Sequence, residues 1–343
     1  MTIKDIARLA GCGVATVSRV LNGQPDVSPR TRERVLAVVA EHDFRPNSNA
    51  RRLKQRADAA VPVLVQGTQN LLFAGLVEQA QAHLRDHGRQ AALYYLDEEA
   101  DGAAFAARLC RERRPAGILF LGGTARAFQR SFAAVTVPCV LLTGSARELG
   151  FDNLSSLTTD DEAAAFQAAS FLLDRGHRAI GVLGGSRPLT QIGLRRLAGL
   201  ERAFGSRGLT FDLERGWEPC RYDLEGGYGA AKRLMERRPE LTALFTMSDV
   251  TAIGAIRALG DLGLRVPEDV SVMGYDGIPL ARYCVPRLTT ICQDTGLLAR
   301  RGVELLLERM ERGGPPVHET APFRLREGES VADLRQKRGS EVV

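Results

Sequence analysis

The stretch Thr2–Gly23, TIKDIARLAGCGVATVSRVLNG, decides the fold of the amino-terminal segment. It opens with Thr-x-x-Asp, a helix-capping signal, and its apolar residues then recur at helical spacing. Gly11 and Gly13 interrupt this first helix, and the pattern predicts a second short helix from about Val14 to Asn22. Two short helices joined by a tight, glycine-containing turn are typical of a helix-turn-helix unit.

A third helix completes this unit. Ser28 precedes Pro29, and an N-cap residue followed by proline at the first helical position is a start signal. Apolar residues then continue at helical spacing: Val35, Leu36, Val39 and Ala40. Residues 1–46 therefore predict a small all-α domain of three helices, the arrangement of helix-turn-helix DNA-binding proteins.

The second helix carries the candidate chemistry of this domain. Val14, Val17 and Leu21 share one apolar stripe. The opposite side presents small and polar side chains: Ala15, Thr16, Ser18, Arg19 and Asn22. Such a surface fits a major groove about 12 Å wide, where a guanidinium can bond guanine and hydroxyls can contact base edges or phosphates. We therefore favour DNA binding over a three-helix bundle with a merely polar exterior.

The positive charge of the chain lies in the same segment. The 343 residues contain 46 Lys and Arg against 41 Asp and Glu, a net charge of +5. Residues 1–58 contain eleven basic and six acidic side chains, so they account for the whole excess. A basic surplus on a unit shaped for docking indicates a polyanionic partner.

Residues 47–58 are predicted to link this domain to the rest of the chain. Four basic residues surround the single apolar residue Leu53 in this segment. A helix this short is marginal in water, so it would form only where a partner supplies contacts, such as a minor groove that accepts an apolar wedge. A flexible tether explains the segment equally well, and both interpretations stay open.

From residue 59 onward, short apolar runs alternate with amphipathic stretches. Strands are predicted at 61–65, 91–95, 117–121, 139–142, 180–183, 244–247 and 270–274, with helices such as 73–87 and 160–175 between them. This alternation predicts parallel, doubly wound sheets covered on both sides, and there are too many elements for one sheet. The sequence therefore predicts an α/β domain of two lobes, with a ligand at the carboxyl ends of the strands.

Several other classes of protein are not favoured. The first residues lack a signal peptide and no run approaches a membrane span, so we expect a cytoplasmic protein without a membrane partner. The six cysteines and five histidines are scattered, which indicates neither a disulfide framework nor a metal site. Nucleotide-binding and hydrolase motifs are missing from the expected places, so the sequence predicts no cofactor and no enzyme.

The motifs of the chain resemble those of the LacI/GalR family of bacterial transcription regulators. Four ordered blocks carry the resemblance: IKDIAxxAG from Ile3, ATVSRVLNG from Ala15, VSxxTRxxV from Val27 and FxPNxxAxxL from Phe44. It extends to about residue 330. It implies a helix-turn-helix domain at 1–46, a hinge helix at 47–58, a periplasmic-binding-protein-like effector and dimerisation domain at 59–330, and a tail at 331–343. The implied lobes are 59–158 plus 288–317, and 159–287 plus 318–330.

The resemblance also implies roles for DNA-contacting residues. Base-reading positions fall on Ala15, Thr16 and Arg19, and backbone-contacting positions on Ser18 and Asn22. The implied hinge contacts are Asn47, Arg51 and Leu53, with Leu53 wedged into the minor groove. One departure is Gly13, where most members have a capping serine. Because glycine caps a helix only a few tenths of a kcal/mol worse than serine, we expect a slightly frayed helix start.

Candidate effector-binding residues come from segments that follow strands. The family motif Arg-x-x-Gly places Arg196 on the ligand-gripping arginine, and a guanidinium suits vicinal hydroxyls or a carboxylate. Ser248, Asp276 and Gln293 fall on further polar ligand positions. Phe73 and Tyr222 are candidates for an apolar wall, although ordinary packing residues would show the same pattern.

Together these features predict a sequence-specific DNA-binding regulator, a repressor controlled by a small polar metabolite such as a sugar, sugar acid or polyol. The family resemblance implies a homodimer on a pseudo-palindromic double-stranded operator, and residues 331–340 have too few apolar repeats for a tetramer-forming coiled coil. The alternatives are a purine- or nucleoside-responsive regulator of the same family and a cytoplasmic sugar-binding protein without a regulatory role.

Overall fold

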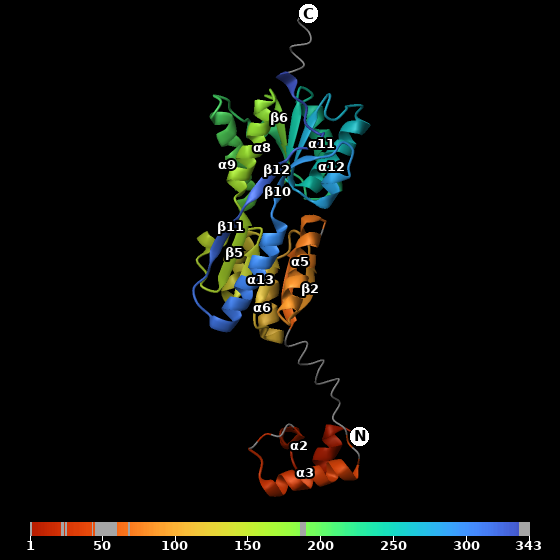
Figure 1. Cartoon of the computed structure of the whole chain (residues 1–343), viewed down its shortest axis with the longest axis vertical. Coiled ribbons are helices and arrows are strands. Elements are labelled where there is room, and N and C mark those ends of the chain that lie inside the picture. The colour runs from red at the N-terminus through yellow and green to blue at the C-terminus, as the bar shows by residue number, and fades with distance from the viewer. Residues whose placement is uncertain are drawn as a thin grey trace, which may run out of the picture. The chain divides into compact units, whose positions relative to one another are not determined.

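A computed structural model describes residues 2–21, 24, 26–42, 44, 60–67, 69–185 and 190–335 (Figure 1). The chain divides into two compact units, Met1–Asp58 and Ala59–Val343. The hinge predicted at 47–58 lies outside the described residues. So do four of the predicted DNA contacts: Asn22, Asn47, Arg51 and Leu53.

The amino-terminal unit contains the three expected helices, α1 (Ile3–Leu9), α2 (Val14–Leu21) and α3 (Pro29–Glu41). The Thr2 hydroxyl accepts the Asp5 N–H in a capping box, and Ser28 caps α3. The buried core consists of Ile6, Ala7, Ala10, Val17, Val20 and Val35. The expected apolar stripe of α2 needs one correction. Val14 is 41% exposed because it is the first residue of α2. The buried residues of this helix, Val17 and Val20, begin about one turn later.

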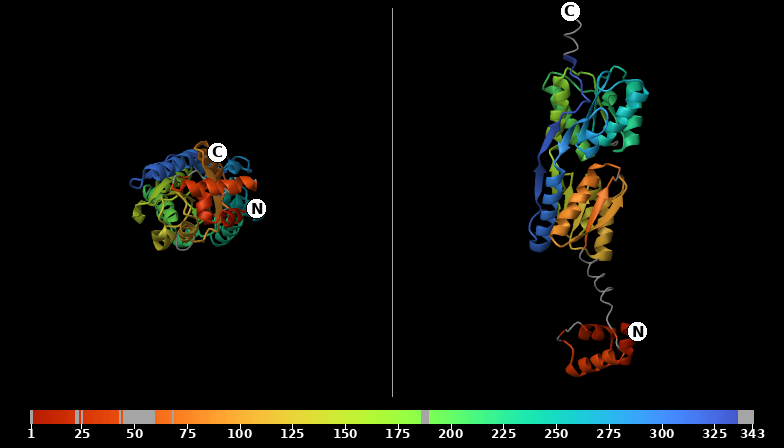
Figure 2. Two further views of the ribbon diagram at one scale, coloured as in Figure 1. Left: turned by 90° about the horizontal axis from the view of Figure 1, so that it is seen from below. Right: turned by 45° about the vertical axis from the view of Figure 1, so that its right-hand side comes forward.

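The first lobe of the second unit is built on a parallel six-stranded sheet in the order β11-β5-β4-β3-β1-β2. Its strands are β1 (Ala60–Gln66), β2 (Gln90–Leu96), β3 (Ile118–Leu121), β4 (Cys139–Leu142), β5 (Leu154–Thr159) and β11 (His318–Ala321). Its helices are α5 (Leu72–Asp86), α6 (Gly102–Arg113), α7 (Ala125–Ser131) and α13 (Thr295–Arg312), with short 3-10 turns at Phe132–Ala134 and Arg147–Leu149. The late helix α13 lies beside the early helix α5 (Figures 1 and 2).

The second lobe contains the sheet β12-β10-β9-β8-β6-β7, in which only β12 is antiparallel to its neighbour. Its strands are β6 (Ile180–Leu183), β7 (Trp217–Glu218), β8 (Ala243–Thr246), β9 (Ser271–Asp276), β10 (Thr289–Gln293) and β12 (Phe323–Arg326). Its helices are α8 (Asp161–Asp174), α9 (Gln191–Gly205), α10 (Leu213–Gly216), α11 (Leu224–Arg237) and α12 (Asp249–Asp261), with a 3-10 turn at Pro279–Arg282. The two-lobed α/β architecture is confirmed.

The boundaries of the lobes differ from the expected ones. The chain leaves the first lobe after β5, close to the predicted crossing near residue 158. It returns after β10 rather than near 287, because β10 pairs with β9 of the second sheet. The third crossing follows β11 rather than preceding it near 318, because β11 pairs with β5. Strand pairing decides these crossings, and an apolar run does not reveal which sheet it joins.

Close helix packing in the second lobe depends on glycine. A Cβ at Gly199 of α9 would lie 2.1 Å from the Glu162 carbonyl oxygen of α8, and one at Gly254 of α12 would lie 2.1 Å from the Leu224 carbonyl oxygen at the start of α11. Each contact lets two helix backbones touch, and the first fixes α9 against α8.

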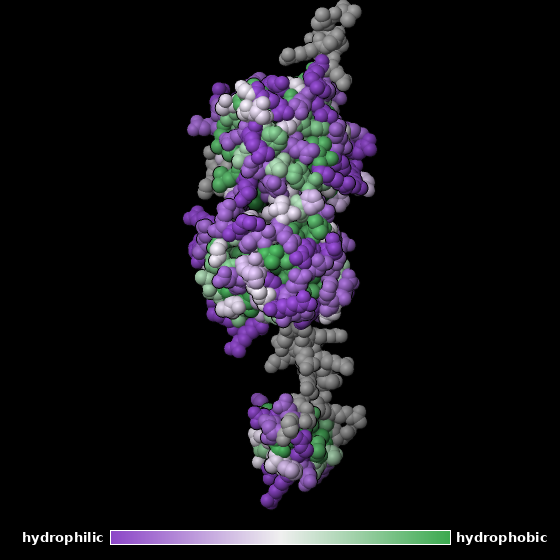
Figure 3. Space-filling view, turned by 60° about the vertical axis from the view of Figure 1, so that its left-hand side comes forward, coloured by the Kyte–Doolittle hydropathy of each residue, from purple (hydrophilic) through white to green (hydrophobic). Residues whose placement is uncertain are grey.

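Three further features of the chain are its surface polarity, its cysteines and the length of its helices. Hydrophilic residues predominate on the face seen in Figure 3, with hydrophobic ones in small groups. All six cysteines are free thiols. Among the described residues, no helix has the length and apolar character needed to cross a lipid bilayer.

Candidate functional site

A cleft of about 710 Å³ lies between the two lobes, where the carboxyl ends of strands from both sheets meet. The first lobe contributes polar and apolar side chains to it, among them Gln66, Asn70, Phe73, Asp97 and Glu98. The second lobe contributes Arg196, Arg221, Tyr222, Asp223 and Asp276, together with Gln293 from β10. This position is the one at which parallel α/β sheets bind ligands.

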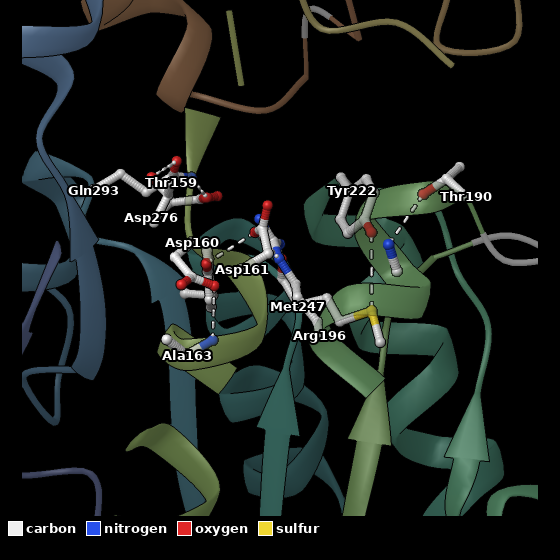
Figure 4. Close-up of polar contacts among 12 residues, drawn as sticks. Thr159, Asp160, Asp161, Ala163, Thr190, Arg196, Tyr222, Met247, Asp276 and Gln293 are labelled. Atoms are coloured by element: carbon white, nitrogen blue, oxygen red, sulfur yellow. Dashed lines mark hydrogen bonds and ion pairs between the residues drawn. The ribbon is translucent and has the colours of Figure 1, made fainter. Parts of the chain in front are cut away.

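Arg196 lies on α9 at the inner end of the cleft (Figure 4). Its Nε donates to Asp161 Oδ1 at 2.8 Å, one terminal nitrogen donates to the Met247 carbonyl, and its guanidinium lies 3.6 Å from the ring centre of Tyr275. The Tyr275 hydroxyl donates to the same Asp161 oxygen at 2.9 Å. Burial alone would lower the pKa of Arg196, but the Asp161 carboxylate raises it, so the guanidinium stays charged. Arg196 is thereby fixed in one orientation.

Gly199 explains why Arg196 reaches this position. The missing side chain at Gly199 lets α9 approach α8 until backbone atoms touch. Arg196 lies one turn earlier on α9, and Asp161 is the first residue of α8, so this approach brings guanidinium and carboxylate together. The motif Arg-x-x-Gly therefore combines a guanidinium that lines the cleft with the packing that positions it.

Asp276 ends β9 with a φ of +123°, in the left-handed region. Its carboxylate accepts the Gln293 amide at 2.8 Å and, from the other lobe, the Asn70 amide at 3.3 Å. Gln293 in turn accepts the Thr159 hydroxyl at 2.8 Å. Burial raises the pKa of Asp276 to about 6. Ligand hydroxyls that replaced the two amides would find a carboxylate acceptor already oriented toward the cleft.

A second buried carboxyl lies behind Asp276. Asp249, the first residue of α12, accepts the Thr290 hydroxyl at 2.5 Å and the Ile278 N–H at 2.8 Å. Burial, with the nearby Asp276 as the next cause, raises the pKa of Asp249 to about 8. Near neutral pH, a negative charge on one of these two neighbouring carboxyls therefore opposes the ionisation of the other.

The structure contradicts the expectation for Ser248. This residue is fully buried and does not line the cleft. Its hydroxyl accepts the Thr251 N–H at 3.3 Å and caps α12, and it also bonds the Thr251 hydroxyl at 2.7 Å. The preceding residue, Met247, lines the cleft instead. A serine at a helix start serves as an N-cap, and here that role turns the side chain away from the ligand space.

The other five predicted effector-binding residues line the same cleft: Phe73, Arg196, Tyr222, Asp276 and Gln293. The Tyr222 hydroxyl contacts only the Met247 sulfur, at 3.9 Å, among the contacts resolved for it. Burial raises the pKa of Tyr222, so its hydroxyl stays protonated. Phe73 and Tyr222 give the cleft an apolar surface beside its polar inner end.

Sequence reasoning missed the residues that connect the two lobes. Arg221, which precedes α11, donates to Asp97 of the first lobe at 2.8 Å and lies 3.6 Å from Glu98. Asn70 reaches Asp276 across the same cleft. Asp97 and Glu98 directly follow β2, so the rule that ligands bind at the carboxyl ends of strands could have identified them.

The helix α2 presents the expected polar surface in the amino-terminal unit. Ala15 and Arg19 are exposed, and Thr16 and Ser18 are partly buried. Arg19 lies 3.4 Å from Asp26 in an ion pair whose two side chains remain about half exposed. In the described parts of the chain, no group of three or more potential ligands is arranged to hold a metal ion.

Comparisons with known proteins match a different family model to each of the two units of the chain. The family described as "Bacterial regulatory proteins, lacI family" matches residues 2–47, and "Periplasmic binding protein-like domain" matches residues 169–331. The HTH-type transcriptional regulator MalR of Clostridium butyricum is 33% identical over 337 residues, which cover 97% of this chain and 100% of that protein. The ribose operon repressor of Haemophilus influenzae is 33% identical and covers 90% of this chain and 92% of its own length.

Two solved structures show the same similarity in three dimensions. A complex of the transcriptional regulator CelR with cellobiose is 29% identical, with a TM-score of 0.71, and the match covers 96% of this chain and 99% of that one. The lac repressor dimer bound to operator and the anti-inducer ONPF is 25% identical, with a TM-score of 0.68, and the match covers 97% of this chain and 99% of that one. The similar proteins named here are transcriptional regulators rather than enzymes.

Proposed function

Because this chain belongs to the LacI family of bacterial regulatory proteins and is a sequence-specific DNA-binding transcriptional regulator, we propose that a small polar metabolite bound in its cleft controls its affinity for operator DNA. The proposal takes the protein as a cytoplasmic repressor and the metabolite as a sugar, sugar acid or polyol. The observation that carries it is the inner end of the cleft. There a fixed guanidinium, Arg196, and an oriented carboxylate, Asp276, face one space beside two aromatic rings.

The DNA-binding half of the proposal assigns base reading to Ala15, Thr16 and Arg19 and backbone contacts to Ser18 and Asn22. The exposure of Ala15 and Arg19 on α2 supports it. The segment with Asn47, Arg51 and Leu53 folds as a hinge on the minor groove. The chain acts as a homodimer on a pseudo-palindromic operator, in line with the dimeric lac repressor bound to its operator.

Of the two alternatives, one has specific support. Relatives described as the HTH-type transcriptional repressor PurR are 31% identical over 317 residues, which favours a purine- or nucleoside-responsive regulator as the second candidate. A purine would stack against Phe73 or Tyr222. A sugar-binding protein without a regulatory role would leave the amino-terminal unit unexplained.

Two measurements on the full chain test the proposal. Selection from random duplex DNA is expected to recover one pseudo-palindromic sequence, and a thermal-shift survey of sugars, sugar acids, polyols and purines is expected to identify a stabilising ligand. Arg196→Ala abolishes that shift. Arg202→Ala on the same helix leaves it unchanged, because Arg202 pairs with Glu162 outside the cleft. Binding that depends on salt but is equally strong for all DNA sequences would contradict sequence-specific regulation.

A further inference from the structure

The outer part of the cleft is organised around Arg221. Its guanidinium donates to Asp97 at 2.8 Å and lies 3.6 Å from Glu98, both in the first lobe. It also lies 3.9 Å from Asp223 in its own lobe. One cation therefore faces three carboxylates, and two of them reach it from across the cleft.

The charges of the described lining do not balance. Its acidic residues are Asp97, Glu98, Asp223, Glu225 and Asp276. Its basic residues are Arg196 and Arg221. Both arginines are already paired, Arg196 with the buried Asp161 and Arg221 with the outer carboxylates. In this part of the lining no cation is left over for an anionic ligand. Arg187 falls in the undescribed stretch 186–189 and is not counted.

Burial opposes the ionisation of two of these carboxyls. Burial raises the pKa of Glu98 although Arg221 acts in the opposite direction. Burial likewise raises the pKa of Asp276 to about 6. The same burial would oppose a further negative charge in the cleft, and that charge would have to compete with three carboxylates for Arg221.

An uncharged polyhydroxyl ligand meets no such obstacle. Each hydroxyl can accept from Arg221 and donate to a carboxylate, so the ligand satisfies both kinds of group without adding charge. Phe73 and Tyr222 provide apolar surface for the faces of sugar rings. The same residues that accept hydroxyls reject a carboxylate or phosphate, because an unpaired charge is costly to desolvate.

We propose that the effector is an uncharged saccharide, because Glu98 and the neighbouring carboxylates exclude sugar acids and phosphorylated sugars while Arg221 offsets only part of their negative charge. The inference rests on the proposed function and narrows its ligand class. According to this proposal, Glu98 and Arg221 have opposite effects on the preference for neutral over anionic ligands. Removing the charge of Glu98 relieves the excess of negative charge, whereas removing the charge of Arg221 increases it.

The first experiment measures binding of matched ligands to the full chain by thermal shift and calorimetry. The panel contains neutral mono- and disaccharides, each beside its uronate, aldonate and 6-phosphate, together with free purines. A neutral sugar is expected to bind at least a hundredfold more tightly than its anionic counterparts. An anionic member that binds as tightly as its neutral parent overturns the inference and leaves the proposed sugar regulator standing. Binding of purines alone, or of no member, contradicts the proposed ligand class itself.

The second experiment tests the two determinants. In Glu98→Gln the ratio between neutral and anionic affinities is expected to narrow about tenfold, and in Arg221→Gln it is expected to widen. Arg233→Gln is the control, because Arg233 lies on α11 and pairs with Glu218 away from the cleft. It should leave the ratio unchanged. Circular dichroism establishes that each variant is folded. Shifts of Glu98→Gln and Arg221→Gln in the same direction, or no shift in either, would refute the electrostatic explanation.

Discussion

Arg196 and Asp161 form the most deeply buried ion pair among the described residues, with side chains only 8% and 4% exposed. Removing one partner of such a pair leaves the other charge buried and uncompensated. Arg196→Met should therefore lower the free energy of unfolding by about 3–5 kcal/mol. The double variant Arg196→Met/Asp161→Asn should recover much of this loss, because the introduced amide would keep an oxygen for the Tyr275 hydroxyl. Urea unfolding measures both values, and equal stability of the single and double variants would contradict the pairing argument.

The pair Asp249 and Asp276 predicts how stability depends on pH. Their pKa values of about 8 and about 6 lie above the 3.8 of a free carboxyl, so the folded chain binds more protons than the unfolded chain between about pH 4 and pH 8. Stability therefore falls as the pH rises through this window, by up to about 1.4 kcal/mol per pH unit for each group. Asp249→Asn should gain stability relative to the parent as the pH rises from 5 to 8.

Thermal unfolding across this pH range tests the expectation. The exposed residue Asp97 provides the control, because its pKa is lowered, chiefly by a hydrogen bond from the Glu99 backbone. Asp97→Asn should therefore differ from the parent by a constant amount above pH 5. A constant difference for Asp249→Asn as well would show that Asp249 ionises normally.

At the scale of helices, the contact between α8 and α9 makes a sharp prediction. Gly199→Ala would place a methyl group 2.1 Å from the Glu162 carbonyl oxygen and force the two helices apart. Overpacking of this kind costs about 1–3 kcal/mol, and it should also weaken ligand binding, because Arg196 moves with α9. Gly205→Ala on the same helix has nothing within 4 Å and should be neutral or stabilising. Equal effects of the two substitutions on urea unfolding would rule out the close approach.

The start of α2 makes a smaller prediction. The Gly13 carbonyl accepts the Thr16 and Val17 N–H groups, and a Cβ at Gly13 would meet only the Thr16 hydroxyl, at 3.9 Å. Gly13→Ser therefore has room to add a side-chain cap worth a few tenths of a kcal/mol. Slower amide hydrogen exchange in the first turn of α2 would show it. Gly11→Ala is the contrasting variant and should accelerate exchange, because Gly11 has a φ of +58° that alanine adopts only at a cost.

The elements that the sequence predicted well are those with a local signal. Strands β4 (Cys139–Leu142) and β6 (Ile180–Leu183) have the bounds that their short apolar runs predict, and α3 begins at the predicted Ser-Pro signal. The interlobe contacts had no local signal, because Asn70 and its partner are 206 residues apart in the sequence. Ser248 was misassigned because the sequence does not show whether a serine after a strand caps a helix or faces a ligand.

On the scale of the whole molecule, the basic excess lies in residues 1–58, and the cleft lies in the other unit. Any influence of effector on operator binding must then pass from one unit to the other. Thermodynamic linkage requires that the effector change operator affinity by the same factor by which the operator changes effector affinity. A common factor different from one distinguishes a regulator from two independent binding modules, for which the factor equals one.

Two variants placed in different units test this linkage. Leu53→Ala should weaken operator binding at least tenfold, because it removes the proposed minor-groove wedge, while effector affinity in the absence of DNA stays within twofold of the parent. Arg196→Ala should weaken effector binding and leave operator affinity in the absence of effector unchanged, since it removes a proposed ligand contact and leaves α2 intact. Fluorescence anisotropy with labelled operator and calorimetry with effector give all four affinities for each variant. A coupling factor of one in the parent chain, or a loss of effector affinity in DNA-free Leu53→Ala, would contradict control of the operator through the hinge.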